Sequence, residues 1–475
     1  MSPTVFIVLI IYLIIIFLIG LWAGKKSNSM TDFLLAGRSL KLWMAVMTIS
    51  ASWFGGGLLI GMGQKTYTSG YVMFFYPLNS LFGLVLAGLL IKKMKDFTSY
   101  TTVTEFLEYR YKSPMLRLLC SLLSLVALIG LVGSQVTSVV SVLTSLGASN
   151  PTMTAICTTI VLVIYTSVGG FLAVTLTDCF QIILVIGGVI AACTVALIQN
   201  GGIGTIVAAL EAQSASLPDG FTSIMGSGGL SFIIFLVLPP TLYALIGQDL
   251  YQRLFACESL KTARKAAIIS GILVCLLTFV PATMGLIARV LYPELAESGK
   301  AAMAIPMIII NHLPDIGVGI VLAAILAAIM STADSLISSA TSHFMNDVWV
   351  RYIDKSGDVN SKSLLIMSRA FTAFVGLAAM IVALILPDII TLCVHSYTLY
   401  TAGAFCPIVL GVLWKKATKE GAFARLFVGV ILAVAGISGF SLAGIPTILL
   451  GGVSSLIVMV VVSLLTYKEE TSATA

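Results

Sequence analysis

The chain of 475 residues is dominated by apolar side chains: 59% are hydrophobic, only 10% are charged, the mean hydropathy is +1.08 and the formal net charge is +6. Soluble globular proteins carry about 25% charged residues, so this composition excludes a soluble domain and indicates that lipid surrounds most of the chain. The eight cysteines lie within or at the ends of apolar runs and form no CxxC pair, which argues against a disulfide framework or a zinc site.

Apolar runs long enough to cross a bilayer follow one another along almost the whole chain. A membrane helix needs about 20 apolar residues to cross about 30 Å of hydrocarbon. We therefore predict an all-α membrane protein with about thirteen transmembrane helices, forming a single integral membrane domain over residues 1–475. The predicted spans are 5–24, 41–64, 70–93, 114–146, 152–169, 173–198, 229–252, 263–290, 317–349, 364–386, 388–413, 421–441 and 446–466.

The basic residues between these spans predict how the chain is oriented. With the N-terminus outside, most lysines and arginines lie in cytoplasmic loops or at cytoplasmic helix ends, Arg253 and Arg425 included. Only Lys65, Arg289 and Lys300 then lie outside, as the positive-inside rule requires. We expect a multi-pass protein of the inner (plasma) cell membrane with an external N-terminus and a cytoplasmic C-terminus. The net positive charge then faces anionic lipid, and no nucleic-acid partner is expected.

Two of the predicted spans contain residues that disturb helices. Gly55, Gly56 and Gly57 stand together in the second span, where each costs about 1 kcal/mol relative to alanine, and Pro239 and Pro240 interrupt the seventh. Interrupted helices at matching positions of two halves are typical of transporters built from inverted repeats. We predict core repeats at about 41–198 and 229–413, with peripheral helices at about 5–24, 421–441 and 446–466. The alternative is that these residues only kink or pack ordinary membrane helices.

A group of small polar residues in the ninth span suggests a cation site. Ala328, Ser331 and Thr332 are spaced i, i+3 and i+4, so they share one helix face. Their oxygens, together with carbonyls freed by the glycine interruption, are ligands that suit sodium. The alternative is that the hydroxyls bond back to their own helix. Asp178 and Asp334 are further candidates, because a carboxylate is costly to place in a membrane.

Several motifs in a fixed order resemble the sodium:solute symporter family, which includes carriers of proline, pantothenate, sialic acid, sugars and choline. The resemblance covers nearly the whole chain. The motifs are FLLAGRSL at 33–40, ASWFGGGLLIGMG at 51–63, YTSVGGFLAVTLTD at 165–178, GQDLYQR at 247–253 and AAIMSTADS at 327–335.

The resemblance implies a leucine-transporter-type core of five plus five helices in inverted repeats, with a sodium ion between the second and ninth spans. Asp178 then resembles the acidic residue on the cytoplasmic sodium exit path of the family, and Arg38 of the GRS sequence resembles a gate or loop anchor. The implied sodium ligands are the main-chain oxygens of Ala51, Phe54 and Ala328 and the hydroxyls of Ser331 and Thr332.

Candidate solute contacts lie at mid-depth near the interrupted helices and spans 3, 4 and 11. Trp53 resembles the tryptophan with which the choline-carrying branch binds a quaternary ammonium by a cation–π interaction. Gly247 stands where that branch has a second tryptophan, which argues against choline. For each aromatic residue the alternative is a packing or interfacial role. The candidates are Trp53, Gly55, Tyr76, Asn79, Phe82, Gln135, Tyr243 and Tyr397.

These features favour a sodium-coupled symporter that imports a small organic solute, such as an amino acid, quaternary amine, monocarboxylate or vitamin-like compound, by alternating access. Na+ is the expected coupling ion, and we expect the solute, sodium and the bilayer as partners, with no obligate protein partner. The alternatives are a passive channel or a sodium-sensing membrane protein on the same fold. An intramembrane enzyme is disfavoured because the three histidines, His312, His343 and His395, form no catalytic motif.

Overall fold

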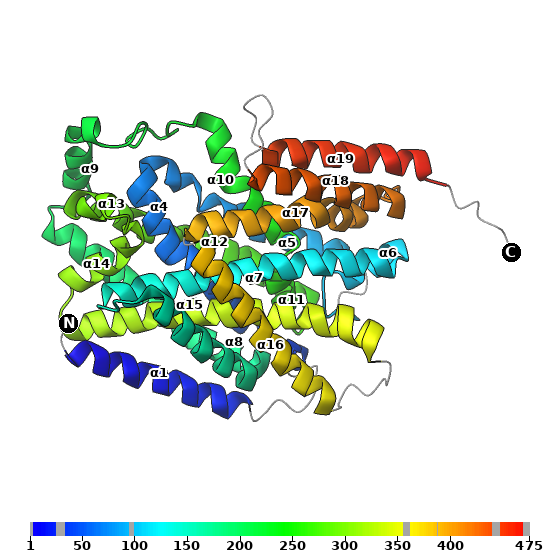
Figure 1. Cartoon of the computed structure of the whole chain (residues 1–475), viewed down its shortest axis with the longest axis horizontal. Helices are drawn as coiled ribbons and strands as arrows, with labels where there is room; N and C mark the ends of the chain where they lie inside the picture. The colour runs from blue at the N-terminus through cyan, green and yellow to red at the C-terminus, as the bar shows by residue number, and fades with distance from the viewer. Residues whose placement is uncertain are drawn as a thin grey trace.

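The computed structural model describes residues 3–24, 34–94, 99–354, 362–386, 388–438 and 447–468. Within these ranges the regular elements are helices, and one isolated bridge pairs Leu40 with Cys257. Most long helices run along the horizontal direction of Figure 1. The long helices are α1 (Pro3–Gly24), α3 (Leu42–Trp53), α5 (Leu78–Leu90), α7 (Pro114–Ser145), α8 (Pro151–Gln199), α10 (Gly229–Ala244), α12 (Leu260–Leu291), α15 (Asp315–His343), α16 (Lys362–Ile385), α17 (Ile389–Leu413), α18 (Lys419–Ile437) and α19 (Thr447–Thr466). Shorter helices are α4 (Met62–Ser69), α6 (Glu105–Tyr111), α9 (Ile203–Ala212), α11 (Gln248–Phe255), α13 (Glu294–Glu297) and α14 (Ala304–His312).

Helices occupy each of the predicted spans, although their lengths differ. By length and composition, eight helices in the described ranges could cross a membrane, or nine if the bent pair Leu42–Trp53 and Gly57–Phe75 is one span. The predicted spans 152–169 and 173–198 differ from the structure, because α8 continues from Pro151 to Gln199 without interruption. Glycines at 169 and 170 disfavour a helix without preventing one. The side chains at 167–170 lie outside the described ones.

Polar side chains fix where several helices begin. Ser113, Asn150, Ser259, Asp388 and Thr418 each accept a hydrogen bond from the backbone N–H three residues ahead. Such a cap satisfies one of the amide donors that a helix start leaves unpaired and stabilises the helix by about 1 kcal/mol. A proline at the first helical position follows the cap in α7 and α8, where a missing N–H costs nothing. These boundaries are therefore encoded locally.

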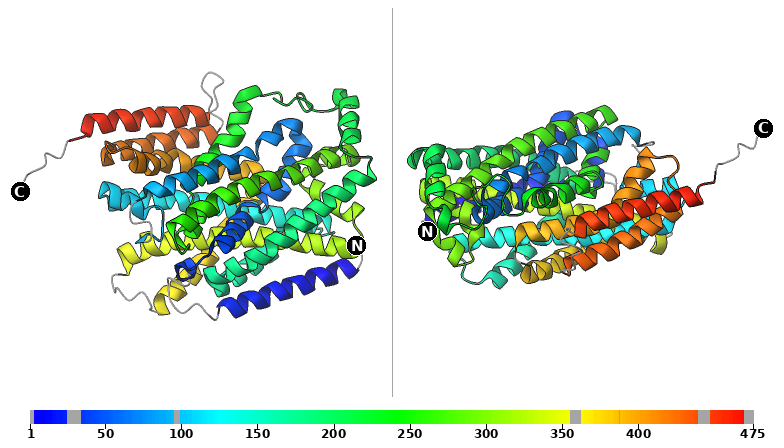
Figure 2. Two further views of the ribbon diagram at one scale, coloured as in Figure 1. Left: turned by 180° about the vertical axis from the view of Figure 1, so that it is seen from behind. Right: turned by 90° about the horizontal axis from the view of Figure 1, so that it is seen from above.

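The central helices pack around α15. This helix contacts α3, α7 and α8, while α12 contacts α3, α4 and α5 on the neighbouring side. α1 packs against α8 and α15, and α18 and α19 pack together against α17. Figures 1 and 2 show α1 and the α18–α19 pair at opposite edges of the molecule. The broken second span is thus enclosed on several sides, whereas the division of the chain into two repeats stays a prediction.

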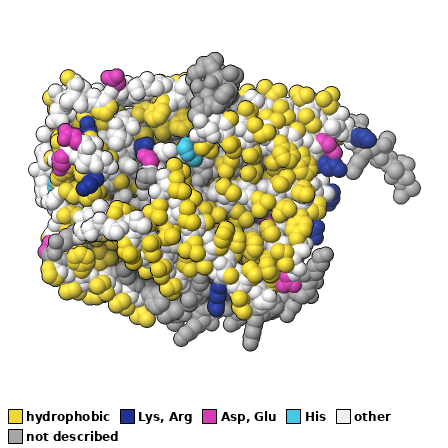
Figure 3. Space-filling view, viewed as in Figure 1, with side chains coloured by type: hydrophobic (Ala, Val, Ile, Leu, Met, Phe, Trp, Pro, Cys, Tyr) yellow, Lys and Arg dark blue, Asp and Glu magenta, His cyan; other side chains and the backbone are white. Residues whose placement is uncertain are grey.

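The surface of the helix bundle is apolar. Exposed aliphatic side chains recur on the outer helices, including Ile10 on α1, Ile381 on α16, Ile431 on α18 and Leu464 on α19. Figure 3 shows hydrophobic side chains over most of the visible face, with most charged side chains toward its left and right ends. An apolar belt between two charged ends is what contact with a bilayer requires.

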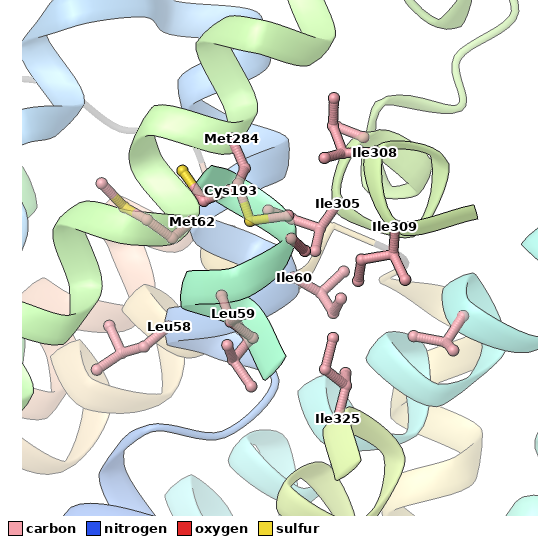
Figure 4. Close-up of a cluster of buried hydrophobic side chains, with 14 of the residues drawn as sticks. Leu58, Leu59, Ile60, Met62, Cys193, Met284, Ile305, Ile308, Ile309 and Ile325 are labelled. Atoms are coloured by element: carbon pink, nitrogen blue, oxygen red, sulfur yellow. The ribbon is translucent and has the colours of Figure 1, made fainter. Parts of the chain in front are cut away.

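A short helix between α12 and α15 covers one half of the broken span. Ile305, Ile308 and Ile309 of α14 lie against the turns that contain Ile60, as Figure 4 shows. α14 approaches the backbone of α4 closely, because a Cβ at Gly63 would lie 2.3 Å from Cγ1 of Ile305. Burial of these aliphatic side chains holds one face of α14 against the broken span, and a hydrogen bond of 3.1 Å between His312 and Asn200 joins the end of α14 to the end of α8.

A buried charge cluster holds the opposite end of α15, the end expected to face the cytoplasm. Asp347 is fully buried and pairs with Arg117 at 2.6 Å and with His343 at 2.8 Å. Three hydroxyls also donate to its carboxylate, those of Thr102 at 2.9 Å, Thr104 at 2.7 Å and Ser121 at 2.6 Å. Arg117 further pairs with Glu105 and Glu108 on α6. The cluster ties α6, α7 and the end of α15 together.

We expect Asp347→Asn to destabilise the protein by about 3 kcal/mol, because an amide cannot accept all the hydrogen bonds of Arg117, His343 and the three hydroxyls and so leaves buried donors without an acceptor. The measurement is thermal unfolding of the purified protein in detergent. Glu420→Gln is the control, since the Lys419–Glu420 pair is 58% and 46% exposed and should contribute almost nothing. Equal unfolding temperatures for the two variants would contradict the role assigned to the cluster.

Candidate functional site

The second span is broken where the glycines predicted it. α3 ends at Trp53, Phe54 leaves the helical region with φ −89° and ψ 46°, and a π-helical turn follows over Gly57–Gly61. The two halves are bent by 56°. A break at this depth leaves backbone carbonyls without intrahelical partners, and in a membrane such groups must find other ligands.

Two of the glycines allow neighbouring helices to touch the break. A Cβ at Gly55 would lie 2.1 Å from Oγ1 of Thr332 on α15, and one at Gly56 would lie 2.3 Å from Oγ of Ser138 on α7. The N–H of Gly56 donates to Oε1 of Gln135 at 2.8 Å. Only glycine permits this approach, so the sequence GGG serves close packing as well as the bend.

Four of the five predicted sodium ligands come together at this contact. Oγ1 of Thr332 lies 3.2 Å from the carbonyl oxygen of Ala51 and 3.0 Å from that of Ala328. Oγ of Ser331 lies 3.2 Å from the same Ala328 oxygen. Phe54, the fifth, is 1% exposed at the end of α3. Both hydroxyls donate to the Ala328 carbonyl of their own helix, as the alternative interpretation predicts. Thr332 also lies within hydrogen-bond distance of the Ala51 carbonyl on α3.

The seventh span breaks later than its prolines predict. α10 continues through Pro239 and Pro240 and ends at Ala244, and α11 begins at Gln248. The fixed φ of proline suits a helix, and membrane helices tolerate the missing donors when neighbouring groups compensate. The turn falls at Gly247, which is extended at ψ 125°. A Cβ there would lie 2.7 Å from Cε1 of Tyr243, so a tryptophan at this position would clash with that ring.

A cavity of about 40 Å³ lies between the two breaks. This is room for about three water molecules, so a larger solute requires the lining side chains to move apart. Ser52, Asp249 and Cys393 also line it. The predicted solute contacts among its lining residues are Trp53, Gly55, Tyr76, Asn79, Gln135, Tyr243 and Tyr397.

Phe82 is not among the lining residues and is 48% exposed. It shares one face of α5 with Leu86 and Leu89, at i, i+4 and i+7, and those two are 43% and 45% exposed. The buried face of α5 carries Asn79 and Gly83 instead. The expectation that Phe82 contacts solute is therefore corrected: helical spacing turns this side chain away from the cavity.

Most polar groups of the cavity already have partners within the protein. The Gln135 amide accepts from Gly56 and donates to Oγ of Ser134 at 3.0 Å, and the Asn79 amide donates to the Tyr76 carbonyl. Tyr243 donates to Oδ1 of Asp249 at 2.8 Å. The indole N–H of Trp53 has no hydrogen-bond acceptor among the described residues.

Asp178 lies in a buried polar network next to the oxygens of the predicted sodium ligands. Its Oδ2 accepts from the Thr48 hydroxyl at 2.5 Å and lies 3.6 Å from Nη2 of Arg253. Arg253 also donates to the Thr48 carbonyl at 3.2 Å and to Oγ of Ser335. Asp334 is likewise fully buried and accepts from the Thr166 hydroxyl. Asp178 is thus buried inside the bundle.

Two arginines that the charge pattern places on the cytoplasmic side are buried in the bundle. Arg253 is 0% exposed and Arg425 is 2% exposed. Arg253 lies on α11, a helix whose residues are all buried. The guanidinium of Arg425 donates to the carbonyls of Ala402 and Thr401 on α17. Their burial is possible because a carbonyl or carboxylate partner can replace water around a guanidinium, and the side of the membrane stays a prediction.

Arg38 anchors the segment before α3. Its guanidinium donates to the carbonyl of Phe255 at 3.1 Å and to that of Tyr100 at 2.9 Å. Leu40 next to it bonds to Ala256 through its N–H at 3.0 Å. Burial lowers the pKa of Arg38 below its usual value, and Glu105 opposes that shift. The residue therefore joins the start of the broken second span to the end of α11.

Comparison with known proteins places this geometry in a family. The family model described as sodium:solute symporter family matches residues 33–429. The chain belongs to the sodium:solute symporter family. Among its relatives, the high-affinity choline transporter 1 of Caenorhabditis elegans is 24% identical over 93% of this chain and 78% of the relative. The sodium/glucose cotransporter 1 of Oryctolagus cuniculus is 25% identical over 90% of this chain and 70% of the relative.

A solved Na+-coupled sialic acid symporter in a substrate-bound outward-open state has the same fold, with a TM-score of 0.83 at 21% identity and 98% of both chains covered. The transporter Mhp1 of the nucleobase-cation-symport-1 family aligns with a TM-score of 0.52 at 12% identity, over 93% of this chain and 96% of that chain. The fold is thus of the leucine-transporter type. As a sodium:solute symporter, the protein is a multi-pass membrane protein that couples sodium to the transport of a small solute.

Two site residues, Arg253 and Asp249, were not selected as candidates from the sequence. Both lie in the GQDLYQR motif, and their i, i+4 spacing with opposite charge in an apolar span was the available signal. Asp249 lines the cavity, and Arg253 lies between it and Asp178. The charges of α11 therefore belong to the centre of the symporter rather than to its surface.

We expect Gly55→Ala to weaken sodium binding by about tenfold or more, since its Cβ would displace Thr332 and overpacking costs about 1–3 kcal/mol. The measurement is the rise in unfolding temperature of the purified protein on titration with NaCl, against KCl at equal ionic strength. Gly57→Ala is the matched control, because its Cβ would meet only Sγ of Cys393 at an ordinary 3.5 Å. Similar sodium titrations for both variants would refute the packing role of Gly55.

Proposed function

We propose that sodium binds between α3 and α15, held by the carbonyl oxygens of Ala51, Phe54 and Ala328 and the hydroxyls of Ser331 and Thr332. The contact of Thr332 with the Ala51 carbonyl across the two helices carries this proposal. A hard monovalent cation takes neutral oxygen ligands, and carbonyls freed at a helix break are suited to that role. When sodium binds, the hydroxyls of Ser331 and Thr332 no longer donate to the carbonyls of Ala51 and Ala328. The hydroxyl and carbonyl oxygens coordinate the ion together instead.

The solute binds in the cavity between the two broken spans. Trp53 and Gly55 line that cavity, and the proposed sodium ligands Ala51 and Phe54 lie beside them in the sequence, so sodium ligands and solute contacts share one segment of chain. Sodium therefore fixes the shape of the wall that solute meets. When both ligands favour the same arrangement of α3 and α15, sodium raises the affinity for solute and solute raises the affinity for sodium by the same factor. This reciprocal effect is the coupling that symport needs.

Sodium leaves toward the cytoplasm past Asp178, and Arg38 acts as part of the inner gate. Asp178 is supported in this role by its burial and by its position one hydrogen bond from Thr48 on α3. Arg38 joins the start of α3 to the end of α11, and both segments must separate if the cavity is to open on that side. Import follows when the opening alternates between the two faces of the plasma membrane.

We expect Ser331→Ala combined with Thr332→Ala to abolish sodium-dependent stabilisation of the purified protein and sodium-driven uptake into proteoliposomes. The uptake assay compares amino acids, quaternary amines, monocarboxylates and vitamins with and without a sodium gradient. Thr278→Ala is the control, because Thr278 is also fully buried and, among the described residues, bonds only to the Val274 carbonyl of its own helix. Full sodium dependence in the double variant would refute the site, and electrical currents far above carrier turnover would indicate a channel.

The proposed orientation places α13 and the loop after it outside and the loop after α17 in the cytoplasm. With Cys157, an exposed native cysteine, replaced by serine, Lys300→Cys should react with a membrane-impermeant maleimide in intact cells. Lys416→Cys should react only after permeabilisation. Both lysines are exposed in the structure, so differences in labelling report the side of the membrane. The reverse pattern would invert the topology.

A further inference from the structure

Asp249 brings a buried negative charge to the wall of the cavity. It lies in the first turn of α11, is 6% exposed and is the one charged side chain among the described lining residues. Oδ1 accepts a hydrogen bond from the Tyr243 hydroxyl at 2.8 Å. Its other close donors are the backbone amides at 249 and 250, which carry no formal charge.

The nearest cation does not form an ion pair with this carboxylate. Nη2 of Arg253 pairs with Asp178 at 3.6 Å, while Nη1 donates to the backbone oxygen of Asp249 at 2.8 Å. Within the described residues, the carboxylate of Asp249 therefore has no ion-pair partner. A buried ion without a compensating charge is strongly unfavourable, so a cation in the cavity would be bound favourably.

The rest of the wall also favours a cation. Four aromatic rings, those of Trp53, Tyr76, Tyr243 and Tyr397, line the cavity, and the rings of Tyr243 and Tyr397 lie 4.6 Å apart. The face of an aromatic ring is negative and attracts ammonium groups, especially where water is excluded. The described lining contains no lysine, arginine or histidine, so a solute carboxylate would meet no basic side chain.

Resting on the function proposed above, we propose that the solute is a small organic cation, an amine or ammonium compound without an acid group, whose positive charge pairs with Asp249. The aromatic rings surround its apolar part, and the free indole N–H of Trp53 can donate to a hydroxyl or ether oxygen. The Gln135 and Asn79 amides hold the wall in place, because their hydrogen bonds go to the protein itself.

The first test compares charged solutes with neutral compounds of the same shape. Sodium-loaded wild-type protein is titrated with propylamine and propanol, ethanolamine and ethylene glycol, choline and 3,3-dimethylbutan-1-ol, and then with putrescine and histamine. Glycine betaine, free proline and propionate complete the panel. The readout is the unfolding temperature in NaCl and in KCl. We expect stabilisation by at least one amine, no stabilisation by its neutral counterpart, and loss of the effect in KCl.

The second test replaces the charge. Asp249→Asn should weaken binding of the amine selected above by more than about 30-fold, as truncation of one partner of a buried charge pair does. Its sodium titration without solute should stay that of the wild type, which also shows that the variant folds. Asp315→Asn, at an exposed carboxyl where α15 begins, is the matched control and should bind the amine normally. Asp249→Glu, which keeps the charge, should bind more tightly than the asparagine variant.

A third readout needs no variant. In proteoliposomes the current and the influx of labelled sodium are measured together. The number of elementary charges moved per sodium ion exceeds one if the solute is a cation and equals one if it is neutral. Preference for a zwitterion, an acid or a neutral compound, or unchanged amine binding in Asp249→Asn, would overturn the inference while sodium stabilisation keeps the proposed function intact. Loss of sodium stabilisation in the wild type itself would instead overturn the proposed function.

Discussion

The structure depends on the contact between the broken second span and α15. A membrane interior offers no water to free carbonyls, so a helix can break there only where another helix supplies partners. Gly55 lets Thr332 come within hydrogen-bonding distance of the Ala51 carbonyl, and Gly56 lets the Gln135 amide reach the backbone from α7. Without these approaches the break would leave unpaired polar groups at mid-depth. The bend, the cavity and the grouping of the predicted sodium-ligand oxygens all depend on this contact between the broken span and α15.

Next to this contact the protein buries charged side chains that apolar packing does not need. Thr48, Asp178, Arg253 and Ser335 form a connected network that no water reaches directly, since each is at most 1% exposed. Buried ionic networks are poor sources of stability compared with apolar packing, which points to a functional reason for their presence. The network links α15, which contributes the hydroxyls of the predicted sodium site, to α11, which ends the seventh span. Short polar contacts therefore connect α3, α8, α11 and α15 next to the cavity.

Local features were predictable from the sequence, whereas features set by helix rotation were not. The break at the glycines and the grouping of Ser331 with Thr332 follow from residue properties and helical spacing alone, and both are present. The break in the seventh span falls several residues beyond Pro239 and Pro240, because neighbouring helices can stabilise a helix that contains proline. Phe82 was assigned to the cavity by depth, but depth does not say which way a side chain faces. Arg253 was placed on the cytoplasmic side by its charge, and its burial was not predictable because its partners lie far away in the sequence.

The short bridge between Leu40 and Cys257 sets an energetic scale for separating the segment before α3 from the end of α11. Separation breaks two backbone hydrogen bonds, from Leu40 to Ala256 and from Glu258 to Leu40, together with the two made by Arg38. At about 1 kcal/mol for each neutral bond and about 2 kcal/mol for each charged one, these four bonds oppose separation by about 6 kcal/mol. A handful of contacts to main-chain carbonyls is thus enough to keep the two segments together in nearly all molecules unless another interaction compensates for their loss.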